Sequence, residues 1–322
     1  MGASSLGSRA IIGKFFQKLE ESTQADYSPK IGIRFNSDQA SEQYNWLGNI
    51  PAVREKVGGY QAVAFRENGI TVANKKFECT LRVSTDDLRR DKTGQIRIRA
   101  AEQGARMGNH WQSLLSTLIA NGETQKCYDG KNFFSTTHTE GDNTTNQSNL
   151  ITYDLSSDSV VGTDYQGTYL NPSPQTVQAM IMKGIQAILG FKDDQNEPMN
   201  QGASKFLVMV PTQFWGATAS AIALPTLAQG MANVIPALQN YSLAIEPVIN
   251  PRLTWTDSLA VFRTDAETKP FIMQEEVAPE YIYLDESTEH AKKNDEVLFM
   301  AKAMRNAAYG MWQQAVKVKA QA

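Results

Sequence analysis

The sequence predicts an α+β fold, because segments with helical and strand periodicity alternate along a chain that has no internal repeat. Apolar residues recur at steps of three and four in 10–20, 95–121 and 173–190, whereas they alternate with polar residues in 70–84. A short apolar run at 206–210 is typical of a buried strand. The absence of a fixed period excludes solenoids and propellers. We therefore expect helices packed on sheets in a non-repeating arrangement.

Composition limits the class of protein. The 322 residues are 41% hydrophobic and 20% charged, which is ordinary for a chain with its own core. No apolar run approaches the roughly 18 to 20 residues that cross a bilayer, and the start MGASSLGSRAIIGKFF lacks the pattern of a secretion signal. We expect synthesis in the cytosol and no membrane partner. A net charge of −3 excludes the strong basic excess of a dedicated nucleic-acid binder.

The first element is a short amphipathic helix over residues 10–20, within an otherwise extended arm. Its apolar stripe consists of Ile11, Ile12, Phe15, Phe16 and Leu19. Such an isolated helix covers little core of its own, so the stripe rests either on its own domain or on a neighbouring subunit. Phe15 and Phe16 are the candidate inter-subunit contacts of this element.

Residues 60–84 follow as a long β-hairpin with its turn at Asn68-Gly69. Charged residues occupy its middle, namely Arg66, Glu67, Lys75 and Lys76. A two-stranded ribbon without an apolar face is marginal in water, so this arm needs a partner. These four residues are therefore further candidate inter-subunit contacts.

A second helix is predicted from 95 to 121, with Asn121-Gly122 as its stop. At about 1.5 Å per residue it would be about 40 Å long. Its first half carries Arg97, Arg99 and Arg106, which form either a solvated, salt-bridged face or a stripe that contacts DNA phosphates. Residues 139–172 are rich in small polar residues and predict an exposed connection.

The second half of the chain predicts a layered domain, either α+β or α/β, over about 171–275. Ser173-Pro174 opens a helix that stops at Gly190, the strand 206–210 follows, and a further helix begins after Pro211. The tail from Asp295 fits two strands as well as a helix, and strands are preferred.

The usual signatures of enzymes are missing, including the phosphate loop, GxGxxG, HExxH and GxSxG. The three histidines have no partner at metal-ligand spacing. Cys127 with His138 as its base is the one catalytic pair worth weighing, and we expect it to be structural. We predict no catalytic, cofactor-binding or metal-binding residues.

Four longer segments are more specific than these patterns. They are YNWLGNIPAVRE at 44–55, ITVANKKFE at 70–78, CYDGKNFFSTTH at 127–138 and RNAAYGMWQ at 305–313. Together they resemble the Mu-like major head subunit family, from about residue 40 to the end. Lys56 stands where that family usually has an aromatic residue, which affects local packing only.

The resemblance implies the HK97-like fold of tailed-phage capsid subunits. In that fold residues 1–58 would form the N-terminal arm and 59–84 the extended hairpin loop. Residues 85–170 would begin the peripheral domain with its spine helix at 95–121, 171–275 would form the axial domain, and 276–322 would return to the peripheral domain.

The resemblance also implies a function, that of a major capsid protein assembling as hexamers and pentamers into an icosahedral head around double-stranded DNA. Its partners would be further copies of itself, a scaffold and a head protease, the portal, a decoration protein and packaged DNA held by weak contacts. No cofactor is implied. The alternatives are a nanocompartment shell protein of the same fold and a cytosolic Cys-dependent hydrolase.

Overall fold

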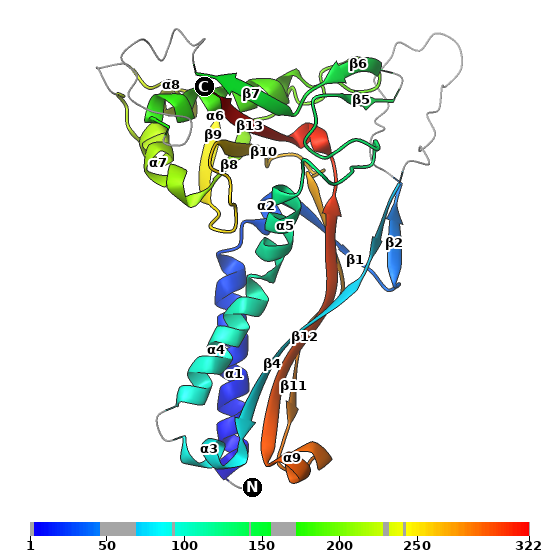
Figure 1. The fold of residues 1–322 in the computed structure, drawn as a ribbon, viewed down its shortest axis with the longest axis vertical. Helices are drawn as coiled ribbons and strands as arrows, with labels where there is room; N and C mark the ends of the chain where they lie inside the picture. Colours follow the sequence, from blue (N-terminus) through cyan, green and yellow to red (C-terminus); the bar gives the residue numbers. More distant parts are fainter. Residues whose placement is uncertain are drawn as a thin grey trace.

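The computed structural model describes residues 3–45, 69–91, 94–141, 143–155, 172–227, 232–240 and 243–321. These residues form an elongated molecule with a narrow stem and a broader head (Figure 1). The N-terminal end of the chain lies at the foot of the stem, and the C-terminal end lies on the head. Both parts combine helices with sheets, so the α+β prediction is confirmed.

The stem is a pair of helices packed on a sheet. Helices α1 (Ala3–Gln24) and α4 (Gln95–Gly108) run side by side along it. The sheet has the order β1-β11-β12-β4, in which β11 and β12 form a long antiparallel hairpin and β1 is parallel to β11. The strands are β1 (Gly32–Asn36), β4 (Lys75–Ser84), β11 (Phe271–Leu284) and β12 (Glu296–Tyr309), and α9 (Glu289–Asn294) joins the last two.

Alternation along the strands builds the core between helices and sheet. Every second residue of β12 from Val297 to Ala303 is buried, because that face of the strand meets the helices. The helices contribute Ile11, Phe15, Ala100 and Met107 to the same two clusters. A buried amide also ties α4 to the sheet, since Gln103 Nε2 donates to the carbonyls of Cys79 and Phe299.

The N-terminal helix is longer than the predicted 10–20, and it packs along its own subunit. Gly104 and Gly108 of α4 let the two helices approach closely. A Cβ at Gly104 would lie 2.3 Å from the carbonyl oxygen of Phe15, and one at Gly108 would lie 2.9 Å from that of Leu19. Residues without a side chain are therefore needed at both positions for this helix pair to form.

The predicted helix 95–121 is two helices, because α4 ends at Gly108 and α5 (His110–Ala120) begins after Asn109. Arg305 of β12 is bound at this break. Its Nη2 donates to the Met107 carbonyl at 2.9 Å, its Nε donates to His110 Nδ1 at 2.9 Å, and its guanidinium lies over the Trp111 ring. The freed carbonyl at the end of α4 thus gains a partner from the sheet.

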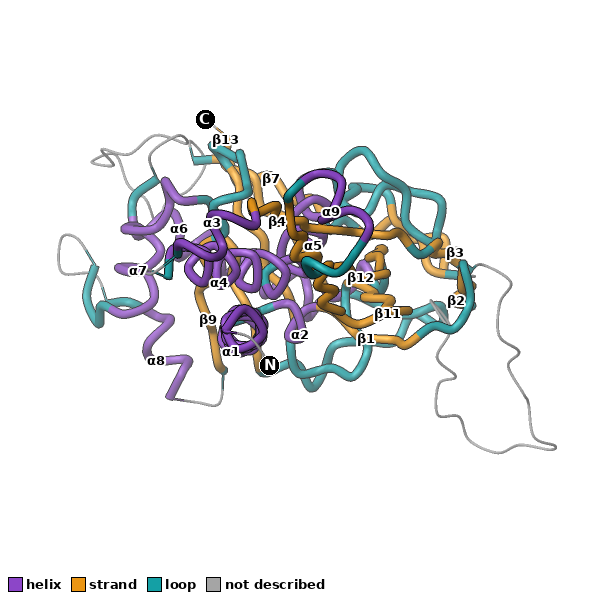
Figure 2. The backbone as a smooth tube through the Cα atoms, turned by 90° about the horizontal axis from the view of Figure 1, so that it is seen from below, coloured by secondary structure: helices purple, strands orange, loops and turns teal. Residues whose placement is uncertain are grey.

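The head contains a five-stranded sheet of order β7-β13-β10-β8-β9, with helices gathered on one side of the molecule (Figure 2). Its strands are β7 (Leu150–Asp154), β8 (Lys205–Val210), β9 (Ala244–Ile249), β10 (Ser258–Arg263) and β13 (Ala315–Gln321). Its helices are α6 (Pro174–Gly190), α7 (Trp215–Ala223) and α8 (Val234–Asn240). Helix α6 has the predicted bounds, and the Ser173 hydroxyl caps it by accepting from the Thr176 N–H.

The hairpin predicted over 60–84 can be compared with the structure only from residue 69 onward. Strand β3 (Ile70–Ala73) pairs with β2 (Ser41–Tyr44), and β4 lies in the stem sheet beside β12. Residues 60–68, which include Asn68 of the proposed turn, lie outside the described residues. The strand pattern of 70–84 was thus interpreted correctly, but its partners come from distant parts of the chain.

Two further predictions concern segments near the head. The tail forms strands β12 and β13, as preferred, and β13 enters the head sheet between β7 and β10. The described part of the predicted connection 139–172, residues 139–141 and 143–155, contains β6 (Asn143–Gln147) paired with β5 (His138–Glu140), and also β7. The short helices α2 (Ser28–Ile31) and α3 (Thr85–Arg90), and the 3-10 helices η1 (Thr212–Phe214) and η3 (Trp312–Gln314), complete the described elements.

Candidate functional site

The two phenylalanines predicted to contact a neighbour differ in exposure. Phe15 has no exposed surface, because its ring lies 4.2 Å from that of Tyr281 and packs among Met107, Ala301 and Ala303. Its contacts are therefore made within the subunit. Phe16 is 43% exposed and remains available to another molecule.

Of the four charged candidates in the predicted hairpin, the structure describes two. Arg66 and Glu67 lie outside the described residues. Lys75 and Lys76 are exposed at the start of β4, where they pair with Arg305 and Met304 of β12. Exposed lysines on an edge strand also discourage unwanted strand pairing, so their position fits either role.

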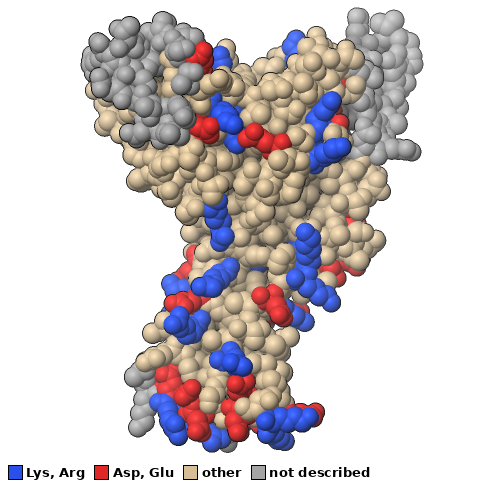
Figure 3. Space-filling model, viewed as in Figure 1, with Lys and Arg blue, Asp and Glu red and all other residues tan. Residues whose placement is uncertain are grey.

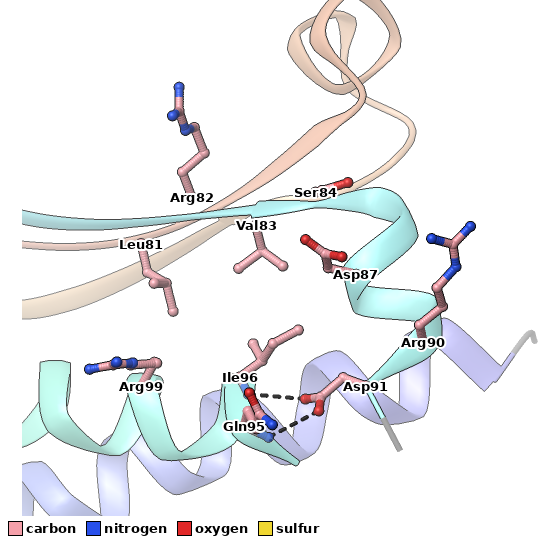
Figure 4. Close-up of a pocket in the computed structure, with 10 residues that line it drawn as sticks. All are labelled: Leu81, Arg82, Val83, Ser84, Asp87, Arg90, Asp91, Gln95, Ile96 and Arg99. Carbon is pink, nitrogen blue, oxygen red and sulfur yellow. Dashed lines mark hydrogen bonds between the residues drawn. The ribbon is translucent and has the colours of Figure 1, made fainter. Parts of the chain in front are cut away.

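The three arginines of α4 are all exposed. Arg99 pairs with Glu102 at 3.0 Å, and it lines a hollow of about 540 Å³ between β4 and the start of α4 (Figure 4). Two other arginines of this hollow have carboxylate partners as well, Arg82 with Glu296 and Arg90 with Asp86. Arg97 and Arg106 lie on the same helix. This distribution matches a salt-bridged, solvated face at Arg99, while the proposed phosphate contacts stay untested.

Cys127 and His138 do not form a nucleophile and base. The Cys127 thiol is buried and donates to the Gly310 carbonyl at 3.4 Å. Burial raises the pKa of this thiol well above its ordinary value, which opposes formation of a reactive thiolate. Both ring nitrogens of His138 contact other groups, namely Asp129, Phe133 and Asn149.

The segments 127–138 and 305–313, which are far apart in the sequence, meet in one buried polar network. The Gln313 side chain donates to Glu140 at 2.6 Å, and Glu140 also accepts from the Tyr128 hydroxyl at 2.8 Å. The His138 ring stacks on Trp312, with centroids 4.2 Å apart and planes 5° apart. The two specific segments are therefore structural partners that join the 121–155 region to the C-terminal strand.

Sequence reasoning missed a long segment of the head that has no charged residue. Residues 206–245 contain no Asp, Glu, Lys, Arg or His, although a fifth of the whole chain is charged. Three large apolar side chains of this segment are exposed, Trp215 by 50%, Leu224 by 47% and Val234 by 47%. The flank of the head around α7 is correspondingly free of colour in Figure 3, whereas the stem carries many charges. The gap in charge between Lys205 and Glu246 was the available signal.

We call Trp215, Leu224 and Val234 the neutral face. They lie at the start of α7, just after its end, and at the start of α8. The Asn233 side chain joins the two helices by donating to the carbonyls of Ala221 and Leu224. The backbone that presents the neutral face is thus held in place.

Two other kinds of site were sought in the described part of the chain. No group of three or more His, Cys, Asp or Glu side chains there could hold a metal ion. Among the same residues, no helix is long and apolar enough to cross a membrane.

Known proteins resemble this chain over limited stretches. The major capsid protein of Escherichia phage Mu is 36% identical over 125 residues, which cover 39% of this chain and 41% of that protein. The Mu-like prophage FluMu major head subunit of Haemophilus influenzae is 26% identical over 170 residues, covering 53% and 55%. The matched regions thus span about half the length of these curated relatives.

A solved structure and a family pattern match more of this chain than the two relatives above. The solved procapsid of bacteriophage JBD30 contains a chain of the same fold, with a TM-score of 0.54 and 19% identity over 100% of this chain and 77% of that one. This likeness confirms the predicted HK97-like capsid fold. The pattern of the Mu-like prophage major head subunit gpT family matches residues 9–159 and 254–322, more than half of the sequence. The chain therefore belongs to the Mu-like prophage major head subunit gpT family.

Proposed function

We propose that this chain is the major capsid protein of a Mu-like phage and assembles as hexamers and pentamers into an icosahedral head around double-stranded DNA. Family membership and the capsid fold support this proposal. The observation that carries it within the molecule is the neutral face, because a lone soluble subunit gains nothing by exposing three large apolar side chains within a segment that has no charged residue.

The neutral face has the composition of an interface centre. Such centres are depleted in charged residues and enriched in aromatic ones, and tryptophan often dominates the binding energy. A face without charge fits against an uncharged surface of a second subunit, because no carboxylate or ammonium group is then buried without a partner. In the assembled head we assign the neutral face to contacts between neighbouring axial domains and the stem to the peripheral domain.

Other contacts in the assembly follow from the remaining exposed groups. Phe16 on α1 and the lysines of β4 would meet neighbouring subunits, and Arg97, Arg99 and Arg106 would face packaged DNA through weak contacts. Scaffold, head protease, portal and a decoration protein would be the other partners, in a protein located in the virion. We assign the chain no catalytic activity and no cofactor.

The alternatives make different demands on the same residues. A Cys-dependent hydrolase would need Cys127 as a thiolate beside a free imidazole, and the contacts of this thiol and of His138 oppose that. A nanocompartment shell would use the same fold, and it would be recognised by enclosed enzyme in place of DNA.

A pair of variants tests the proposal through the neutral face. Trp215→Ser should leave the thermal melt of the subunit nearly unchanged, because the side chain is half exposed, while the yield of particles in electron microscopy falls strongly. Truncated interface tryptophans commonly cost about 2 kcal/mol or more at each contact. Leu189→Ser is the matched control, since Leu189 is 38% exposed on α6 outside residues 206–245. Equal particle yields from the two variants would contradict the assignment.

A further inference from the structure

His138 is a buried ring whose nitrogens both face hydrogen-bond acceptors. It begins β5 and has no exposed surface. Its Nδ1 lies 2.5 Å from Asp129 Oδ2, and its Nε2 lies 3.2 Å from both the Phe133 carbonyl and Asn149 Oδ1. A neutral imidazole carries one N–H only, so it can donate on one side of the ring but not on both.

The other hydrogen bonds of Asn149 show that its Oδ1, and not its Nδ2, faces the His138 ring. Its Nδ2 donates to the Phe133 carbonyl at 2.7 Å, and its Oδ1 accepts from the Ser135 N–H at 2.8 Å. Exchanging the two atoms would place an N–H against the Ser135 N–H. The Phe133 carbonyl can only accept, and the Asp129 carboxylate accepts from the Lys131 N–H with its other oxygen. A neutral ring would therefore direct a lone pair at an acceptor in a buried site, which is unfavourable.

We propose that His138 is held as an imidazolium by Asp129, and that this proton locks the 121–155 region onto the C-terminal strand. Stacking on Trp312 places the positive ring over an aromatic face, a contact that favours the cation. Asn149 continues the connection, because its backbone carbonyl accepts from the Lys317 N–H at 2.8 Å. Removing the proton would weaken the contacts from His138 to Asn149 and Phe133 together.

The charges around the ring agree with a cation at this place. Asp129 and Glu140 are the carboxylates of the surrounding turn and strand, and both are nearly buried. Burial raises the pKa of both the Cys127 thiol and the Tyr128 hydroxyl well above their ordinary values, so these groups stay neutral. On β13, Lys317 is paired with Glu123 at 2.5 Å. The imidazolium thus offsets the charge of the Asp129 carboxylate beside it.

Nuclear magnetic resonance of the ring nitrogens in the whole unassembled chain tests the protonation state directly. We expect both His138 nitrogens to carry protons at pH 7.5, where an exposed histidine is mostly neutral. A neutral tautomer in the folded chain at that pH would overturn the proposal. This readout needs no variant, so it decides the matter even if substitutions at this buried position prevent folding.

Thermal melts of two variants supply a second test. His138→Gln should lower the melting temperature, because it removes the ring nitrogens that face Asp129, Phe133 and Asn149. His290→Gln on α9 is the matched control and should change the melting temperature little, because the described contact of this ring is with Asn294 on the same helix. A His138 variant as stable as the native chain would contradict the lock. The test is independent of shell formation, so it separates this inference from the proposed function.

Discussion

The contact between α1 and α4 depends on Gly104, and adding one methyl group there should loosen the stem. In Gly104→Ala the new Cβ would lie 2.3 Å from the Phe15 carbonyl oxygen and 3.3 Å from the Leu19 amide nitrogen. Both atoms belong to the backbone of α1, so no side chain can rotate away. Since ordinary contact begins at 3.4 Å, the helices must separate by about 1.1 Å at this point, the difference between 3.4 and 2.3.

Two opposing effects set the size of the change. Overpacking of this kind destabilises by about 1 to 3 kcal/mol, and the separation also weakens the packing of the buried Phe15. Alanine is favoured over glycine within a helix by about 1 kcal/mol. We expect a net loss of about 1 to 2 kcal/mol, which corresponds to a melting temperature lower by about 1.5 to 3 °C for a chain of this size.

The matched control is the same substitution where space is open. Gly13 lies in the middle of α1, and a Cβ there would meet nothing within 4 Å. Gly13→Ala should therefore stabilise by about 0.5 to 1 kcal/mol through helix propensity alone. Circular dichroism melts of the two variants compare them directly. If Gly104→Ala raised the melting temperature as Gly13→Ala does, the close α1–α4 contact would be refuted.

Two other outcomes test the break between α4 and α5 and the role of Cys127. Burial, helped by the positive charge of Arg305, lowers the pKa of His110 to about 4, so between about pH 6.5 and 4 the unfolded chain binds a proton that the folded chain does not bind. As the pH falls through that window, the free energy of unfolding should decrease by about 1 to 2 kcal/mol after allowance for partial exposure. In His110→Gln, the melting temperature measured from pH 7 to 4 should depend less on pH. Cys127→Ala should lower stability by about 1 kcal/mol and leave particle yield unchanged in electron microscopy, whereas lost assembly in a folded variant would indicate a further role for the thiol.

Elements with local signals were predicted well. Helix α6 begins after Ser173 and ends at Gly190, because its cap, its first-turn proline and its stop are all encoded next to it. The strands of 70–84 and of the tail were also expected, since alternation is visible in any short window.

Contacts between distant segments could not be predicted from local sequence patterns. Strand periodicity does not identify the partner strand, so β4 was assigned to a hairpin, whereas it lies beside β12. The need for glycine at positions 104 and 108 could not be predicted from the sequence, because it depends on how closely the backbone of α1 approaches.

The candidate site was predictable only in part. Phe16 could be expected to be exposed, but Phe15 next to it could not be expected to be buried, because that depends on Tyr281 and on β12. The neutral face could have been found from the missing charges of 206–245. The network of His138 and Gln313 depends on two segments meeting in space, and each segment alone gave no indication of it.

A reconstruction of the assembled particle by electron cryo-microscopy tests the central proposal most directly. The proposal predicts a closed shell of hexamers and pentamers in which Trp215, Leu224 and Val234 are buried between adjacent subunits, while Phe15 stays within its own subunit. A protein that remains monomeric at high concentration with scaffold supplied would contradict it. So would a closed shell in which the neutral face is exposed to solvent.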